Sequence, residues 1–213
     1  EHPYIVYAGC SQGRHIRETG PKGCVWVAVE DAGLQAEFVP VDVFRWFSLT
    51  VDIAGAQRMD DVAGAFGRAL KAEITKQGDA PCCVRVVLRG RCSLHGRLCT
   101  DPDSVCANIR AVATDVSRGR AWIEKVALAT APDFDIRELA QSDTPQGELL
   151  RYLEGLSANK QIYEELDVDL TPLKSKLAGS TVAVPEDTMD DALRGARDIL
   201  LAMLADQEGT EKT

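Results

Sequence analysis

The amino-acid sequence predicts an α+β protein built in three parts, and three features of its pattern support this class. Residues 1–44 hold short apolar runs bounded by glycine-containing turns, as is typical of strands. Residues 45–130 alternate such strands with two segments whose apolar residues recur at helical spacing. Residues 131–213 open with a linker-like Ala-Pro-Asp and then show mainly helical spacing. We therefore expect three regions with these bounds.

The first region is expected to form three short strands, at Tyr4–Ala8, Cys24–Glu30 and Gln35–Val41. Turn residues lie between the last two strands, at 31–33, and predict a hairpin. Three strands without a helix cannot enclose a core of their own. We therefore expect an exposed sheet edge, covered by another copy of the chain or by neighbouring molecules.

The middle region begins with a cleanly alternating strand at Arg45–Ile53. A helix is expected at residues 60–77, because apolar residues recur on one face, and Gly78 can end it. The next strand is expected at Cys83–Arg89, followed after a turn by a short partner strand at Cys92–Leu98.

A second helix is expected to begin after Asp101, with proline in its first turn, and to run to about Ser117. Ala121–Ala129 is then the closing strand. The order β-α-β-β-α-β is typical of a split βαβ arrangement of one sheet and two helices. Another α+β arrangement of the same elements stays open.

The last region is expected to be a helical tail. Thr144 can cap a helix over residues 144–157, a second amphipathic pattern covers 160–178, and the clearest helix spans 188–206. Its apolar stripe either packs on its own chain or docks a partner helix. The stripe consists of Met189, Ala192, Leu193, Ala196, Ile199, Leu200, Met203 and Leu204.

Composition limits the classes of protein that this chain can belong to. The 213 residues are 45% hydrophobic and 27% charged, as in ordinary globular proteins. No apolar run approaches the roughly 20 residues that span a bilayer, so we expect no membrane partner. The seven cysteines are odd in number and form no C-x-x-C motif, so we expect a reducing, cytoplasmic setting.

Charge is distributed unevenly along the chain. Residues 1–130 hold 16 basic and 15 acidic residues, a net charge of +1, whereas residues 131–213 hold 8 and 18, a net charge of −10. An acidic segment repels nucleic acid. Any contact with DNA is therefore expected in residues 1–130.

The segment between the first two expected strands is the best candidate for a functional loop. It is rich in glycine and offers an amide, two guanidinium groups and an imidazole, which suits binding of an oxyanion such as phosphate. The alternative is a surface loop with solvated charges. The motif is Tyr7-x-Gly9-x-x-Gln12-Gly13-Arg14-His15-Ile16-Arg17-Glu18-x-Gly20-x-Lys22-Gly23-Cys24.

This motif resembles the loop that follows the last metal-binding motif of SbcD-type DNA repair exonucleases, especially their YhaO-like bacterial branch, within the calcineurin-like metallophosphoesterases. The resemblance is strongest over residues 3–30 and continues to about residue 130. It implies that residues 1–44 are terminal β-strands of a phosphoesterase sandwich. It also implies that residues 45–130 form an α+β capping domain and that residues 131–213 form the helical C-terminal region.

The resemblance assigns roles to three residues of the loop. Arg14 and His15 would lie at the rim of a dinuclear metal centre in the full-length enzyme, with Gln12 beside them as a phosphate-binding residue. Arg14 could hold a phosphate by two hydrogen bonds, and His15 could donate to a non-bridging oxygen or assist the leaving group. The alternative for His15 is that it bonds the loop backbone and fixes its shape.

The resemblance also implies that cleavage chemistry lies upstream of residue 1. Phosphodiester hydrolysis of this kind uses two metal ions, here expected to be manganese, held by Asp, His and Asn. The chain has only His2, His15 and His95, and none lies in an H-x-H, D-x-H or H-E-x-x-H pattern. We therefore expect no metal site and no cofactor in this chain, and expect it to be inactive by itself.

A second candidate surface is basic. Residues 80–100 contain no carboxylate. Arg85 and Arg89 would point the same way from a strand, so they could contact DNA phosphates without reading sequence. The alternative is an ordinary solvated sheet face. The basic residues of the segment are Arg85, Arg89, Arg91, His95 and Arg97.

These expectations combine into a hypothesis about function. The chain would be the accessory, capping portion of a metal-dependent DNA repair exonuclease, guiding DNA to a metal centre elsewhere. Its C-terminal helices would dock an SbcC-like coiled-coil ATPase, and a homodimer is a further expected assembly. Two alternatives stay open: a self-contained interaction module that acts through its acidic helices, and a relative that acts on a small phosphoester.

Overall fold

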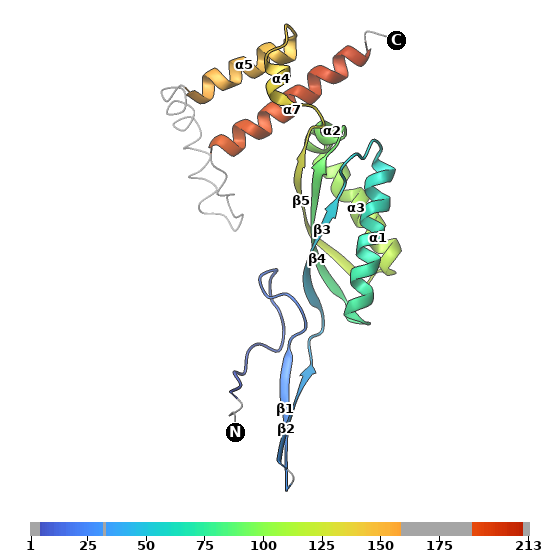
Figure 1. The fold of residues 1–213 in the computed structure, drawn as a ribbon. Coiled ribbons are helices and arrows are strands. Elements are labelled where there is room, and N and C mark those ends of the chain that lie inside the picture. The colour runs from blue at the N-terminus through green and yellow to red at the C-terminus, as the bar shows by residue number, and fades with distance from the viewer. Residues whose placement is uncertain (1–4, 32, 159–188, 211–213) are drawn as a thin grey trace, which may run out of the picture. The chain divides into compact units, whose positions relative to one another are not determined.

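The structure is a computed structural model that describes residues 5–31, 33–158 and 189–210. These residues belong to two compact units (Figure 1). The first comprises residues 1–94 and 101–131, and the second comprises residues 95–100 and 132–213.

The first unit begins with an extended segment and a hairpin. Strands β1 (Gly23–Glu30) and β2 (Gly33–Pro40) pair antiparallel, with Glu30 opposite Gly33. The expected hairpin is therefore confirmed. The expected first strand is wrong for the described residues, because 5–8 adopt no strand. A strand needs a neighbour to bond its backbone groups, and none of the described strands pairs with these residues.

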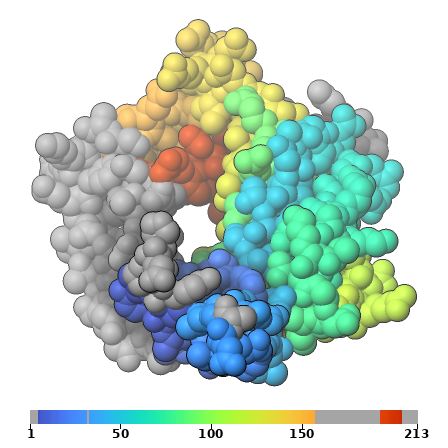
Figure 2. All heavy atoms as spheres, turned by 60° about the horizontal axis from the view of Figure 1, so that its bottom comes forward, coloured from blue at the N-terminus to red at the C-terminus, as the bar shows by residue number. Residues whose placement is uncertain are grey.

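One face of the hairpin is apolar and exposed. Strand alternation places Val25, Val27 and Val29 on the same face as Phe38 and Leu34, their cross-strand neighbours. Val29 is 78% exposed and Phe38 is 49% exposed. The hairpin comes forward in Figure 2, with no other described segment in front of it.

The rest of the first unit is a three-stranded parallel sheet. Its strands are β3 (Arg45–Asp52), β4 (Cys82–Arg91) and β5 (Ala121–Ala131), in that order, with β4 in the centre. Parallel neighbours require a crossover, and helices α1 (Met59–Gln77) and α3 (Pro102–Ser117) supply the two crossovers. Both helices lie on the same side of the sheet (Figure 1).

The core lies between the sheet and these helices. Phe47, Leu49 and Val51 of β3 are buried on the helix side, while Ser48 and Thr50 between them are exposed. Fully buried side chains from the other elements complete this core. They are Val62, Phe66, Leu70, Val84, Val86, Leu88 and Ile109. Within the described residues of this unit, no helix covers the opposite face of the sheet.

The mixed α and β composition agrees with the sequence prediction, but the β-α-β-β-α-β order is wrong. The expected strand at Cys92–Leu98 does not form, and helix α2 (His95–Thr100) occupies most of it. The physical reason is that β4 already has β3 and β5 on its two edges, so no edge remains for a hairpin partner. The observed order is β-α-β-α-α-β.

The helix ends in this unit follow the signals read from the sequence. The backbone of Gly78 ends α1 with φ of 67°, a value that favours glycine. The carboxylate of Asp101 accepts a hydrogen bond from the backbone N–H of Ser104 at 3.1 Å and so caps α3. Asp61 accepts from the N–H of Arg58 at 2.9 Å at the start of α1.

The second unit is helical. It contains α2, α4 (Ile136–Ala140), α5 (Pro145–Ala158) and α7 (Met189–Thr210). The hydroxyl of Thr144 accepts from the N–H of Gly147 at 3.2 Å, which confirms the expected cap of α5. The sequence prediction missed α4. The pattern at 160–178 lies outside the described residues.

The buried face of α7 differs from the expected stripe. Leu201 is 6% exposed and packs with Ala140 and Leu150, whereas Met203 of the stripe is 54% exposed. Ile199, Leu200 and Met203 of the stripe are exposed, so this described part does not pack fully on its own chain, and docking of a partner helix stays a prediction. Asp198 of the same helix pairs with the buried His95 of α2. None of the described helices is both long and apolar enough to cross a membrane.

Candidate functional site

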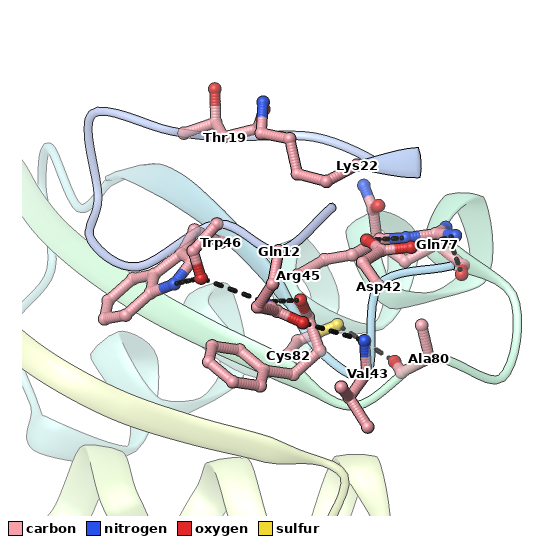
Figure 3. Close-up of polar contacts among 12 residues, drawn as sticks. Gln12, Thr19, Lys22, Asp42, Val43, Arg45, Trp46, Gln77, Ala80 and Cys82 are labelled. Atoms are coloured by element: carbon pink, nitrogen blue, oxygen red, sulfur yellow. Dashed lines mark hydrogen bonds and ion pairs between the residues drawn. The ribbon is translucent and has the colours of Figure 1, made fainter. Parts of the chain in front are cut away.

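The loop that carries the sequence motif is fastened to the start of β3 by one amide. The Nε2 of Gln12 donates to the carbonyl oxygens of Gly13 and Phe44, each at 2.9 Å, and its Oε1 accepts from the N–H of Val43 at 2.8 Å (Figure 3). Both N–H hydrogens of the Gln12 amide and one acceptor position of its oxygen are therefore used in hydrogen bonds to the backbone. This geometry gives Gln12 a positioning role in the loop.

Trp46 makes the second attachment. Its indole N–H donates to the carbonyl of Gly13 at 3.0 Å (Figure 3). Its own carbonyl accepts a hydrogen bond from the N–H of Gly20 at 3.1 Å. A Cβ atom added to Gly13 would lie 2.7 Å from the carbonyl oxygen of Glu18. Only glycine fits at this position without a shift of the loop. The loop is thus held in a defined shape beside the parallel sheet.

The side chains of Arg14 and His15 lie on the solvent-exposed side of the loop. Their side chains are 78% and 54% exposed, and both approach the same carboxylate oxygen of Glu18 at 3.4 Å. The N–H of Arg14 also donates to that carboxylate at 2.8 Å. This backbone hydrogen bond is the main cause that lowers the pKa of Glu18, with the neighbouring charges of His15 and Arg14 adding to it. An incoming phosphate would compete with Glu18 for both side chains.

The ring of His15 is oriented by the loop itself. Its Nδ1 accepts a hydrogen bond from the backbone N–H of Arg17 at 3.2 Å, so the ring proton lies on Nε2, facing Glu18. The structure thus shows the backbone hydrogen bond of His15, while its role toward a phosphate stays a prediction. One ring nitrogen fixes the backbone, and the other is an accessible donor.

Two arginines of β4 form ion pairs with carboxylates of the neighbouring strands. Arg85 donates from Nε and Nη2 to the carboxylate of Glu124 on β5, at 2.9 and 2.6 Å. This pairing is the main cause that raises the pKa of Arg85 and lowers that of Glu124. Arg89 lies 3.8 Å from Asp52 on β3. The uncovered sheet face is therefore largely charge-balanced at these two arginines.

The remaining basic residues are divided between the two units. Arg91 is exposed at the end of β4, on the same alternation as Arg85 and Arg89. Arg97 is exposed on α2 and belongs to the second unit. His95, on the same helix, is only 6% exposed and is paired with Asp198. The structure therefore places the arginines of β4 on one face of the sheet, whereas Arg97 and His95 belong to the other unit.

The described residues do not fit a dinuclear metal centre. Among them, no group of three or more His, Cys, Asp or Glu side chains converges on one point. His15 has a single carboxylate neighbour, Glu18, and its other ring nitrogen is used by the loop backbone. We therefore assign no step of phosphodiester cleavage to these residues.

Two features of the first unit were not predicted from the sequence. One is the pairing across strands, since Glu124 is 39 residues from Arg85 and no local pattern links them. The other is Trp122, which is 72% exposed at the start of β5. Its outward position in an alternating strand was the available signal.

Comparison with known proteins links the middle of the chain to one family. Residues 46–131 match the family described as "Metallophosphoesterase YhaO, middle domain". A 90-residue segment is 36% identical to the protein of Bacillus subtilis (strain 168) described as "Uncharacterized metallophosphoesterase YhaO". That segment is 42% of this chain and 22% of the relative, so the chain spans about a fifth of its length. The middle of the chain is therefore similar to part of a metallophosphoesterase.

A solved structure also aligns with the chain. It is RNase H1 from the halophilic archaeon Halobacterium salinarum NRC-1, at 19% identity and a TM-score of 0.21, over 57% of this chain and 80% of that one. A TM-score this low does not establish a shared fold.

Proposed function

We propose that the chain is the C-terminal accessory portion of a metal-dependent DNA repair exonuclease of the SbcD and YhaO type. Its role is to shape the access of DNA to two manganese ions that residues outside this chain bind. The observation that carries the proposal is the match of residues 46–131 to the middle domain of a metallophosphoesterase. That match begins at Trp46, whose indole N–H donates a hydrogen bond to the loop.

The proposal divides the chain into three functional regions. Residues 1–44 are the last strands of the phosphoesterase sandwich, and the apolar face of the β1–β2 hairpin packs on the rest of that sandwich. Residues 45–130 are the capping domain. Residues 131–213 dock an SbcC-like coiled-coil ATPase, and the acidic charge of this region keeps it away from DNA.

The loop suits a role at the rim of a phosphodiesterase centre. Its backbone is fixed by Gln12 and Trp46, so Arg14 and His15 need little ordering when a phosphate arrives. Glu18 holds both side chains in the absence of substrate. A phosphate group that replaces the Glu18 carboxylate can accept two hydrogen bonds from the Arg14 guanidinium and one from the N–H of the His15 imidazole.

The sheet face adds a weaker positioning surface. Arg85, Arg89 and Arg91 follow one alternation of β4, and contacts of this kind hold a phosphate backbone without reading its sequence. Because Glu124 and Asp52 balance two of these charges, we expect this surface to contribute less to affinity than the loop does.

The test uses the intact protein that contains this chain, with Mn²⁺, on three substrates. These are linear duplex DNA, covalently closed circular duplex DNA and bis(4-nitrophenyl) phosphate. The proposal predicts Mn²⁺-dependent degradation of the linear duplex, with the closed circle spared. Hydrolysis of the small diester without any action on DNA would favour the small-phosphoester relative. Inactivity on all three, with stable self-assembly, would favour the interaction module.

A further inference from the structure

A buried ion pair lies where the β1–β2 hairpin joins the parallel sheet. The Nε and Nη2 of Arg45, the first residue of β3, donate to the two carboxylate oxygens of Asp42 at 2.8 and 3.3 Å (Figure 3). The side chain of Arg45 is 16% exposed and that of Asp42 is 1% exposed. Burial opposes the ionisation of Asp42, but hydrogen bonds from Arg45 and from the backbone of Lys22 keep its pKa below the ordinary value. Both side chains are therefore charged at neutral pH.

The two residues connect segments that are far apart in the sequence. The third guanidinium nitrogen of Arg45, Nη1, donates to the carbonyl of Gln77 at the end of α1 at 3.0 Å. The backbone N–H of Arg45 donates to the carbonyl of Pro81, just before β4, at 2.9 Å. The backbone N–H of Asp42 donates to the carbonyl of Lys22 at 3.2 Å. Because Lys22 directly precedes β1, the pair joins the end of the motif loop to the start of the sheet and to α1.

Stability alone does not account for a charged pair at this place. Removing a carboxylate and a guanidinium from water costs free energy, and apolar residues of similar volume often stabilise such a position equally well. An apolar pair cannot supply direction, however. The planar guanidinium directs its N–H groups at fixed angles, here toward two carboxylate oxygens and one carbonyl. The pair therefore fixes the orientation of the segments that it joins.

We propose that Asp42 and Arg45 are positioning residues for phosphodiester cleavage, because they hold the motif loop at a fixed orientation to the capping domain. Gln12 and Trp46 attach the first part of this loop, and the ion pair attaches its end at Lys22. Asp42 and Arg45 act through the loop, since their nearly buried side chains are not open to DNA. The inference rests on the proposed function, because it assigns these residues to the same reaction.

The test compares variants of the intact protein in Mn²⁺-dependent digestion of linear duplex DNA. The double variant Asp42→Leu with Arg45→Met replaces both charges by apolar side chains of similar shape, so it should keep the urea midpoint of wild type. Its kcat should fall about 10- to 100-fold because the loop is displaced from the reacting phosphate. Its KM should stay within about threefold, since the DNA-binding surfaces remain. A merely stabilising pair predicts wild-type kcat at this unchanged midpoint.

Arg120→Gln is the matched control. Arg120 donates to the carbonyl of Gly78 at 2.9 Å, next to the carbonyl that Arg45 binds, and its carboxylate neighbour Asp79, at 3.6 Å, is fully exposed. This variant loses the same kind of contact at the end of α1 without a contact to the loop. Its kcat and KM should match those of wild type.

A second measurement does not depend on digestion. Asp42→Asn keeps the shape of the side chain and removes its charge. Amide hydrogen exchange of residues 13–22, followed by mass spectrometry, should be faster in this variant than in wild type or in Arg120→Gln. Unchanged exchange of these residues would overturn the inference.

Failure of the inference is distinguishable from failure of the proposed function. DNA digestion by wild type, with the same kcat in the double variant, removes only the positioning role of Asp42 and Arg45. Faster loop exchange in Asp42→Asn, without digestion of DNA by wild type, removes the nuclease proposal and leaves the attachment of the loop by this pair.

Discussion

The Nε2 of His95 lies 3.2 Å from the Oδ2 of Asp198, so a buried ion pair joins α2 to α7 within the helical unit. The side chains are 8% and 15% exposed. Hydrogen bonding to Asp198 is the main cause that raises the pKa of His95 to about 9, and Cys99 adds to it. Arg197 donates to the other carboxylate oxygen of Asp198 at 2.8 and 2.9 Å. Hydrogen bonds from His95 and Arg197 keep the pKa of Asp198 low despite its burial.

This pair predicts that the stability of the helical unit falls at alkaline pH. The folded pKa of His95, about 9, lies above its ordinary value of 6.5. Its contribution is therefore fully present below pH 6.5 and is lost as the pH rises through about 9. The loss is on the order of 3 kcal/mol.

The measurement is urea unfolding followed by far-ultraviolet circular dichroism at pH values on both sides of this window. His95→Gln should be less stable at neutral pH and should lose the alkaline decline. His15→Gln, in the exposed loop, is the control and should keep it. An equal decline in His95→Gln would show that other groups cause the effect.

A second prediction concerns the pairing of Arg85 with Glu124. Glu124→Gln should release the guanidinium and raise the affinity of the intact protein for duplex DNA about threefold at low salt. Glu73→Gln removes the same charge from a pair with Lys76 on α1 and is the matched control. Fluorescence anisotropy at several salt concentrations makes the comparison. Equal effects of the two variants would mean that only overall charge matters, and the sheet face would not contact DNA.

A third prediction separates two roles of Gln12. If its amide fixes the loop, Gln12→Ala should lower the free energy of unfolding by about 1–3 kcal/mol, because backbone groups of Gly13, Val43 and Phe44 lose partners. The salt dependence of DNA binding should stay the same. Gln57→Ala, at an exposed position, should have little effect on stability. Unchanged stability with a loss of DNA affinity would instead assign Gln12 to phosphate binding.

A fourth prediction contrasts two glycines. Gly13→Ala should destabilise the protein by about 1–3 kcal/mol, since its Cβ would lie 2.7 Å from the Glu18 carbonyl oxygen. Gly67→Ala, inside α1, meets its nearest atoms at 3.5 Å and should raise stability by about 0.5–1 kcal/mol. Thermal unfolding of both variants measures the two shifts. A stabilised Gly13→Ala variant would show that the loop does not approach Trp46 as described.

Local patterns were enough to place most of the described elements. Alternation predicted β3, because half of its side chains face the core, and the signals at Gly78 and Asp101 located helix ends. The strand predicted at Cys92–Leu98 was wrong because of the strand order of the sheet, and not because the residues disfavour a strand. A short apolar run suits a strand or a helix equally, and only the occupied edges of β4 decide between them.

The candidate site was predictable only where its residues are neighbours in sequence. The glycine-rich loop presents Arg14 and His15 to solvent, as its composition suggested. The carboxylates that meet Arg85 and Arg89 come from other strands, so the basic segment alone overstated the positive charge of the sheet face. The role of Gln12 depends on backbone groups near residue 44, which no spacing rule connects to the loop.

The most direct test of the account is the rate of Mn²⁺-dependent digestion of linear duplex DNA by Arg14→Gln, with Arg17→Gln as its matched control. Arg17 carries the same charge in the same loop, and none of the described carboxylates pairs with it. Loss of a charge-assisted phosphate contact should lower kcat/KM about 10- to 100-fold in Arg14→Gln. Arg17→Gln should stay within about threefold of wild type. Equal rates for Arg14→Gln and wild type would contradict the placement of this loop beside the reacting phosphate.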